Sequence, residues 1–196
     1  MNISAIIEES SNPLYKIPVF LSYAVPYNSL QTKFLETIIN KIKCQLIFPR
    51  TLGRSEQYTE TPIISIKRMM LSNYGCLATA FKRAYIPEAI VKPNSQQEQI
   101  INNFWTTSPY LQIEIAMSIQ RGLPVMILVE DGVNTDGVFG GVLQQGATPY
   151  NIISFSLTDY ESIEKFFESV FWRETFLDWV GKVRGFYNKE TDPMIQ

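Results

Sequence analysis

Hydrophobic residues follow two patterns along this chain. Continuous apolar runs predict strands, and apolar residues at helical spacing predict helices. Continuous apolar runs are typical of strands that are covered on both faces of a sheet. Five such runs lie at 19–24, 44–48, 75–81, 124–130 and 150–157. Between them, apolar residues at helical spacing predict helices at 29–43, 63–73, 109–121 and 160–186. Because strands alternate with helices, we predict an α/β fold of three layers, with a mostly parallel sheet, helices on both faces and one long C-terminal helix.

Capping residues mark the start of two of these helices. Asn28 or Ser29 can cap the first helix, and Ser108 can cap the third, with Pro109 at its first helical position. The segment 82–107 has no clear period and contains two prolines. We predict that it is an irregular excursion with a short helix at 95–104.

Length and composition favour one packed domain. The chain has 196 residues, of which 45% are hydrophobic and 18% charged, which is ample for a buried core. We predict an N-terminal extension at 1–16, the α/β domain at 17–157, and a helical extension at 158–196 that packs on the same domain.

The charge pattern restricts the partners that we expect. The formal net charge is −2 and no basic stripe stands out, which argues against a nucleic-acid surface. The first residues lack the basic start and apolar core of a secretion signal, and no apolar run approaches the roughly 18 residues of a membrane span. We therefore expect a cytoplasmic protein without a membrane partner, in which Cys44 and Cys76 are buried free thiols.

The chain contains no histidine. Nucleophiles that depend on a histidine base and metal centres with histidine ligands are therefore excluded, and we expect no metal site. A general acid or base must be a carboxylate, a tyrosine, a lysine or a cysteine.

Glu114 is the first candidate for chemistry. It lies in the helix 109–121, among apolar residues, and this helix precedes a strand that is apolar throughout. One interpretation is a partly exposed carboxylate that the helix dipole favours. The other is a carboxylate that faces the carboxyl ends of the strands, where parallel sheets bind ligands, and contacts a ligand hydroxyl.

Two further segments lie at the same predicted rim of the sheet. Arg50 and Arg54 belong to a loop with Gly and Ser that directly follows a strand. Their guanidinium groups either bind a diphosphate or are solvated, as is common in loops. Ser22 and Tyr23 end the first strand and either line a pocket or only lead into a turn. The aromatic stripe within 166–179 indicates core or an oligomer seam.

Four stretches of the sequence resemble one known family. They are 19-VFLSYA-24, 50-RTLGR-54, 72-SNYGCLATAF-81 and 108-SPYLQIEIAMSIQRGLPVMIL-128. Together they resemble the TIR domain, and most closely the bacterial TIR-like proteins of the Thoeris anti-phage type. The helix with Glu114 is also similar to that of the nucleoside 2-deoxyribosyltransferases. The resemblance covers roughly residues 17 to 157 and implies a flavodoxin-like, TIR-like fold.

What this resemblance implies is an enzyme that cleaves the bond between nicotinamide and ribose in NAD+. NAD+ is then the substrate, and no further cofactor is needed. Such enzymes release, cyclise or transfer the ADP-ribose product. This product activates a partner effector that stops phage infection. Glu114 is the implied catalytic carboxylate. The implied substrate-binding residues are Ser22 and Tyr23 beside the ribose or nicotinamide, Arg50 and Arg54 beside the diphosphate, Tyr58 and Phe81 as stacking surfaces, and Asn28, where many TIR domains carry an aspartate. Asn73 stands where an acidic residue is expected.

The chemistry agrees with the composition. Nicotinamide leaves as a neutral base, so no acid has to protonate it, and a carboxylate stabilises the ribosyl cation. Two alternatives remain open. One is a nucleoside deoxyribosyltransferase or nucleotide hydrolase that uses the same glutamate. The other is a non-catalytic TIR-like adaptor that self-associates through the aromatic C-terminal helix and the segment 131–146.

Overall fold

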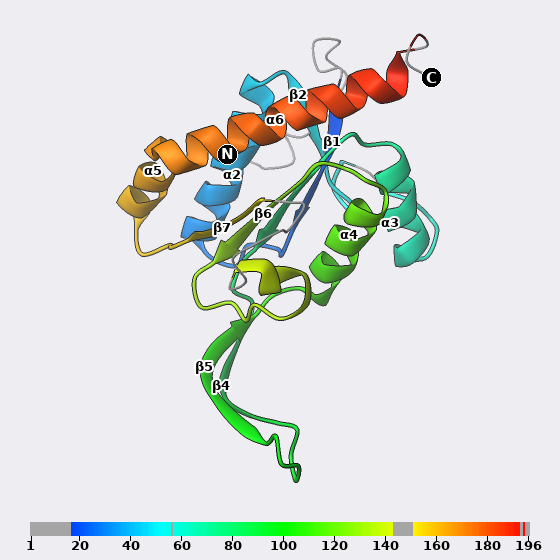
Figure 1. Ribbon diagram of the computed structural model, residues 1–196. Coiled ribbons are helices and arrows are strands. Elements are labelled where there is room, and N and C mark those ends of the chain that lie inside the picture. Colours follow the sequence, from blue (N-terminus) through cyan, green and yellow to red (C-terminus); the bar gives the residue numbers. More distant parts are fainter. Residues whose placement is uncertain (1–16, 56, 143–150, 193, 195–196) are drawn as a thin grey trace.

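A parallel sheet of five strands forms the centre of the computed structural model, which describes residues 17–55, 57–142, 151–192 and 194. Its strands are β1 (Ile17–Tyr23), β2 (Ile47–Arg50), β3 (Cys76–Ala80), β6 (Val125–Glu130) and β7 (Asn151–Phe155). They lie in the order β2-β1-β3-β6-β7, and all four pairings are parallel (Figure 1).

This strand order is that of the flavodoxin-like doubly wound fold, in which the second strand lies outside the first and the later strands follow on the other side. The direction of winding reverses between β1 and β3. The predicted class, a three-layer flavodoxin-like sheet with helices on both faces, is confirmed.

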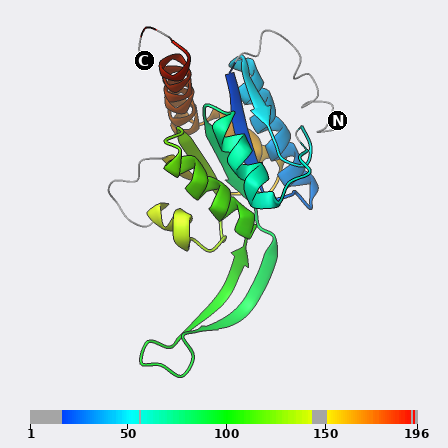
Figure 2. The ribbon, with the colours of Figure 1, turned by 90° about the vertical axis from the view of Figure 1, so that its right-hand side faces the viewer.

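Helices cover both faces of the sheet, as the apolar strands predicted. Helices α2 (Ser29–Cys44), α5 (Tyr160–Glu168) and α6 (Val170–Thr191) pack in one core cluster with Val19 and Leu21 of β1. Helices α3 (Pro62–Leu71) and α4 (Pro109–Gln120) pack in a second cluster with Phe20 of the same strand. Figures 1 and 2 show the two groups of helices on opposite sides of the sheet.

A two-stranded antiparallel ribbon replaces the irregular excursion. Strands β4 (Ala84–Val91) and β5 (Gln99–Thr106) pair along their length, and the ribbon projects away from the sheet in both views (Figures 1 and 2). The helix predicted at 95–104 is wrong. The isoleucines of this segment meet partners across the ribbon, for example Ile100 opposite Ile90, and β-branched side chains favour such cross-strand pairs.

The second strand begins later than predicted. Helix α2 extends through Cys44, Leu46 adopts a left-handed backbone with φ of 57°, and β2 begins at Ile47. The strand includes Pro49 instead of stopping at it. Proline is tolerated there because β2 is an edge strand, in which a missing N–H need not break a ladder.

The C-terminal helix is interrupted once. Ser169 has an extended backbone between α5 and α6, and its hydroxyl oxygen accepts a hydrogen bond from the Trp172 N–H at 3.1 Å. Because Ser169 caps a new helix, the chain forms two helices here although the apolar spacing is continuous. The single helix predicted at 160–186 is therefore wrong. The second of the two, α6, has 22 residues.

The C-terminal helices belong to the core of the domain. Phe167, Phe176 and Trp179 are buried with the residues of α2 and the sheet, whereas Val170 and Phe171 of the same stripe are exposed.

The prediction for the thiols holds in part, since Cys76 is buried but Cys44 is exposed, and both are free. No helix in the described part of the chain is long and apolar enough to cross a membrane. The segments 1–16 and 143–150 lie outside the described residues.

Gly75 lies where α6 packs most closely against the start of β3. A Cβ atom at this position would lie 2.5 Å from the Val183 side chain and 3.3 Å from that of Val19. Gly181, in the same helix as Val183, has open space around it.

We therefore expect opposite effects from two glycine-to-alanine changes. Gly75→Ala should lower the free energy of unfolding by about 1–3 kcal/mol, because the new methyl group overpacks the core. Gly181→Ala should raise it by about 0.5–1 kcal/mol, because alanine is the better helix former. Urea denaturation of both variants and the wild type measures this, and equal effects of the two changes would contradict the packing described at Gly75.

Candidate functional site

Glu114 and Ser22 meet at the point where the winding of the sheet reverses. Ser22 is buried near the end of β1, and its hydroxyl donates a hydrogen bond to Oε2 of Glu114 in α4. Helix α4 turns this side of its surface toward the sheet because Leu111, Ile115 and Ser118 are buried there. The structure therefore supports the second interpretation of Glu114, a carboxylate that faces the strand rim.

Burial sets the protonation of Glu114. It raises the pKa of this carboxyl from the ordinary 4.5 to about 7, and the hydrogen bond from Ser22 opposes this rise. The protonated and ionised forms are therefore both populated near neutral pH. A group with such a pKa in a hollow is typical of a functional site.

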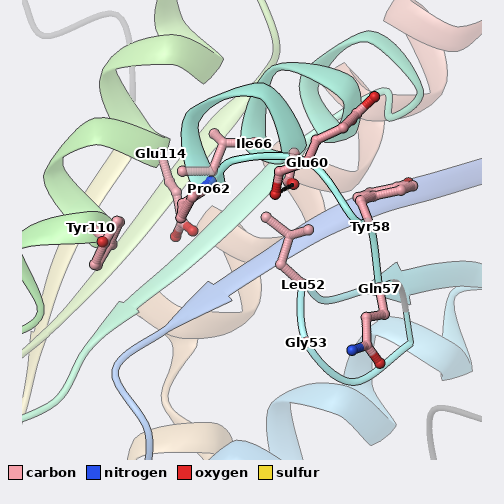
Figure 3. A pocket seen from close by; sticks show the side chains of 10 residues that line it. Leu52, Gly53, Gln57, Tyr58, Glu60, Pro62, Ile66, Tyr110 and Glu114 are labelled. Atoms are coloured by element: carbon pink, nitrogen blue, oxygen red, sulfur yellow. Dashed lines mark hydrogen bonds between the residues drawn. The ribbon is translucent and has the colours of Figure 1, made fainter.

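Two neighbouring hollows open on either side of Glu114, with volumes of about 370 Å³ and 280 Å³. Both are lined by Glu114, Leu52 and Gly53. In the first hollow, Glu114 and Tyr110 of α4 lie opposite the loop that follows β2 (Figure 3). The site therefore has a floor formed by strands, one wall formed by helices and another wall formed by this loop.

Four of the predicted residues line these hollows together with Glu114. Ser22, Tyr23 and Arg54 line the second hollow, and Tyr58 lines the first. The guanidinium carbon of Arg54 lies 5.9 Å from the centre of the Tyr23 ring. Burial raises the pKa of the Tyr23 hydroxyl, and the charge of Arg54 acts in the opposite direction.

Three predicted residues lie elsewhere. Arg50 donates hydrogen bonds of 2.9 Å to the backbone oxygen and to the hydroxyl of Ser72, and thereby ties the end of β2 to the end of α3. Asn28 accepts a hydrogen bond from the Gln31 N–H at 2.8 Å and caps α2. Phe81 is fully buried against the Phe34 ring. None of the three lines either hollow.

Sequence reasoning missed part of the lining. Tyr110 lies one turn before Glu114, and this spacing of four residues was the available signal for a shared helix face. Gly53, with φ of 76°, adopts a backbone that suits glycine and brings the main chain to the hollow. Glu60 lines the first hollow as a second carboxylate and forms an ion pair of 3.2 Å with Arg68, and nothing in the sequence pattern distinguished it.

A buried polar network holds the neighbouring part of the rim. Oε2 of Glu130, at the end of β6, accepts hydrogen bonds of 2.9 Å from the Gln31 side chain and from the Lys82 N–H. The Lys82 ammonium group lies 3.9 Å from the other carboxylate oxygen. Gln31 in turn accepts a hydrogen bond from the Tyr27 N–H at 3.1 Å. The network joins the ends of β3 and β6 to the start of α2.

Asn73 lies before the amino end of β3, away from the rim. Asn73, at the position where an acidic residue was expected, is buried and donates a hydrogen bond to the Met69 carbonyl. Within the described residues, no group of three or more His, Cys, Asp or Glu side chains could hold a metal ion.

Comparisons with known proteins show distant structural neighbours. No family model matches the chain, and none of the curated proteins does. The chain is similar to the flavodiiron core of Flv1 from Synechocystis, at 10% identity and a TM-score of 0.46. The match covers 90% of this chain and 38% of that one, so this chain spans well under half of that protein.

Two further neighbours are equally distant. The CMP N-glycosidase BcmB of Clostridium botulinum is 13% identical with a TM-score of 0.43, over 76% of this chain and 96% of that one. The TIR domains of the activated Roq1 resistosome are 13% identical with a TM-score of 0.39, over 88% of this chain and 84% of that one. The neighbours thus include a TIR domain and an N-glycosidase.

The buried carboxyl predicts a pH dependence of stability. Because the pKa of Glu114 is raised in the folded state, its contribution to stability is full below about pH 4.5 and is lost as the pH rises through about 7. Glu114→Gln does not titrate, so its stability relative to the wild type should increase between these two pH values, by on the order of 2 kcal/mol. Urea unfolding of both proteins at pH 5 and pH 8 measures the difference, and a constant difference would contradict the burial described for Glu114.

Proposed function

We propose that this protein cleaves the N-glycosidic bond between nicotinamide and ribose in NAD+, with Glu114 as the catalytic carboxylate. The observation that carries the proposal is the partly buried Glu114 carboxylate, to which Ser22 donates a hydrogen bond and which lines two hollows at the strand rim. Ser22 occupies Oε2, which leaves Oε1 for a ligand.

The environment of Glu114 suits a cationic substrate. Burial makes the ionised carboxylate unfavourable, as its raised pKa shows, and a nearby positive charge would stabilise it. Both the pyridinium ring of NAD+ and the ribosyl cation carry such a charge. A partly desolvated carboxylate gains more from a neighbouring cation than one in water does, which is the condition for stabilising a transition state.

The reaction needs few groups. The bond between C1′ of the ribose and the pyridinium nitrogen breaks, and the electron pair leaves with neutral nicotinamide. Glu114 stabilises the oxocarbenium ion that remains. A water molecule or a hydroxyl group then adds to C1′ and loses its proton, which yields ADP-ribose or a cyclic or conjugated derivative. No group on the protein has to protonate the leaving base.

The two hollows can divide the substrate between them. Arg54 and Tyr23 line the second hollow, where a guanidinium group can bind the diphosphate. Tyr58 and Tyr110 line the first, where aromatic rings can hold the nicotinamide. Arg50 is engaged with Ser72 and takes no part in this assignment.

The proposed role follows from the product. We propose that the ADP-ribose derivative is a signal that activates a partner effector in anti-phage defence, and that the protein acts in the cytoplasm. The resemblance of residues 17–157 to Thoeris TIR-like proteins supports this role. The chemistry alone predicts only nicotinamide release.

The first test is chromatography of NAD+ incubated with the purified protein, alone and in lysate from phage-infected cells. We expect nicotinamide release by the wild type and a loss of about 10²-fold or more with Glu114→Gln, because the charge that stabilises the cation is removed. Glu36→Gln, on α2 across the sheet, is the matched control and should keep full activity. NADH should not be cleaved, because its nicotinamide ring carries no positive charge.

Two results would contradict the proposal. Equal nicotinamide release by the wild type and Glu114→Gln would remove the carboxylate from the mechanism. Exchange of the base on a deoxynucleoside, without loss of NAD+, would instead identify a deoxyribosyltransferase.

The pH dependence of the reaction tests the protonation state. Because the ionised form of Glu114 acts, kcat/KM should rise with pH through about 7, the pKa of this group. Ser22→Ala removes the hydrogen bond that lowers this pKa, so its profile should move to higher pH. Initial rates between pH 5.5 and 9 measure both profiles. A rate that falls across neutral pH would mean that the protonated carboxyl acts as an acid.

A further inference from the structure

The loop between β1 and α2 exposes two large apolar side chains at the edge of the second hollow. Val25 lines this hollow and is 68% exposed, and Tyr27 follows two residues later and is 57% exposed. Single exposed apolar residues are common on soluble proteins, whereas two of them together beside a hollow form a small surface that a ligand can cover.

Both side chains point to the same side of the loop. Val25 precedes Pro26, and a residue before proline is restricted to extended backbone. Asn28 is extended as well, with φ of −135° and ψ of 169°. Ala24 is buried and Pro26 half-buried, which is the alternation that an extended segment produces. Tyr27 therefore lies on the same side as Val25, about 7 Å further along the loop.

The backbone of this loop is fixed at both ends. The Ala24 N–H donates a hydrogen bond of 3.2 Å to the Thr79 carbonyl. The Tyr27 N–H donates one of 3.1 Å to the Gln31 side chain, which is fully buried and also bonds to Glu130. Tyr27 therefore stands on a backbone that is already ordered before a ligand binds, which lowers the cost of binding.

The proposed substrate has one part that the two hollows do not enclose. With nicotinamide in the first hollow and the diphosphate beside Arg54 in the second, the adenosine is joined to the diphosphate and continues past it. A pocket that encloses a whole drug-sized ligand has about 300–1,000 Å³. The second hollow has a volume of only about 280 Å³. The adenosine therefore lies at its open edge, where Val25 is exposed.

We propose, on the basis of the NAD+ cleavage proposed above, that Val25 and Tyr27 bind the adenine base of the substrate, with the base stacked on the Tyr27 ring. Every nucleobase has flat faces that stack on aromatic side chains. Val25 and Tyr27 are uncharged, which suits a neutral base, whereas the diphosphate has Arg54 as its partner. The two side chains lie apart from Glu114, so they contribute to substrate binding and not to the breaking of the bond.

The first measurement compares KM and kcat for NAD+ and for nicotinamide mononucleotide, which has the same reactive bond but no adenosine. Tyr27→Ala should raise KM for NAD+ about tenfold and leave kcat unchanged, because a stacking contact is lost from the bound substrate and the transition state alike. The KM for the mononucleotide should stay the same. Tyr27→Phe restores the ring and should behave as the wild type does.

Tyr160→Ala is the matched control. Tyr160 is 54% exposed at the start of α5 and lines neither of the two hollows beside Glu114. Its replacement should leave the KM values for both substrates unchanged.

Titration calorimetry with ADP gives a second measurement that requires no cleavage. ADP contains the adenosine and the diphosphate but no nicotinamide, so the wild type should bind it. Tyr27→Ala should bind ADP about tenfold more weakly, and Tyr27→Phe should bind it as tightly as the wild type does.

Three results would overturn the proposal. One is a wild type that does not bind ADP, and another is an equal rise in KM for both substrates in Tyr27→Ala. The third is self-association of the chain that Tyr27→Ala abolishes while ADP binding stays intact, because the two side chains would then form a contact between copies.

This inference and the proposed function can fail separately. ADP binding that depends on Tyr27, without nicotinamide release, would contradict the proposed function alone. Nicotinamide release with a KM for NAD+ that Tyr27→Ala leaves unchanged would contradict the adenine site alone.

Discussion

The alternation of side chains along β1 is the constraint on which the site depends. Val19 and Leu21 point to the face covered by α2, α5 and α6, and Phe20 points to the face covered by α3 and α4. Ser22 follows in the same register as Phe20 and therefore meets Glu114 under α4. A shift of one residue in this strand would place a leucine beside the Glu114 carboxylate. It would also turn Ser22 toward the opposite face of the sheet, into the core under α2, α5 and α6.

A second constraint fixes the rim next to this pair. Glu130 is buried, and such a carboxylate is costly unless it is fully hydrogen-bonded. Gln31 and Lys82 supply its partners from α2 and from the end of β3. Because Glu130 would be a buried and unpaired carboxylate without these partners, the network ties the ends of β3 and β6 to the start of α2.

The sequence predicted the layers of the fold because these depend on regular periods. Apolar runs located all five strands of the main sheet, whereas helical spacing left two orientations of Glu114 open, and only the packing of Leu111, Ile115 and Ser118 decides between them. The ribbon escaped prediction because the segment 82–107 has no clear period, and only the pairing of β5 with β4 defines it as two strands. Phe81 was placed by resemblance alone, and the partners of Phe81 and Arg50 are distant in the sequence, so no linear pattern reveals them. Asn28 takes the helix-capping role that its position before the first helix allowed.

The two walls of the site are built from different kinds of structure. Ser22 and Glu114 are carried by the sheet and a packed helix, whereas Leu52, Gly53 and Tyr58 belong to a connecting loop. A loop of this kind tolerates changes of sequence and length that a core strand does not. The loop wall of the hollows can therefore change in sequence and length while Ser22 and Glu114 stay in place, so the shape of the site can vary without disturbing the carboxylate.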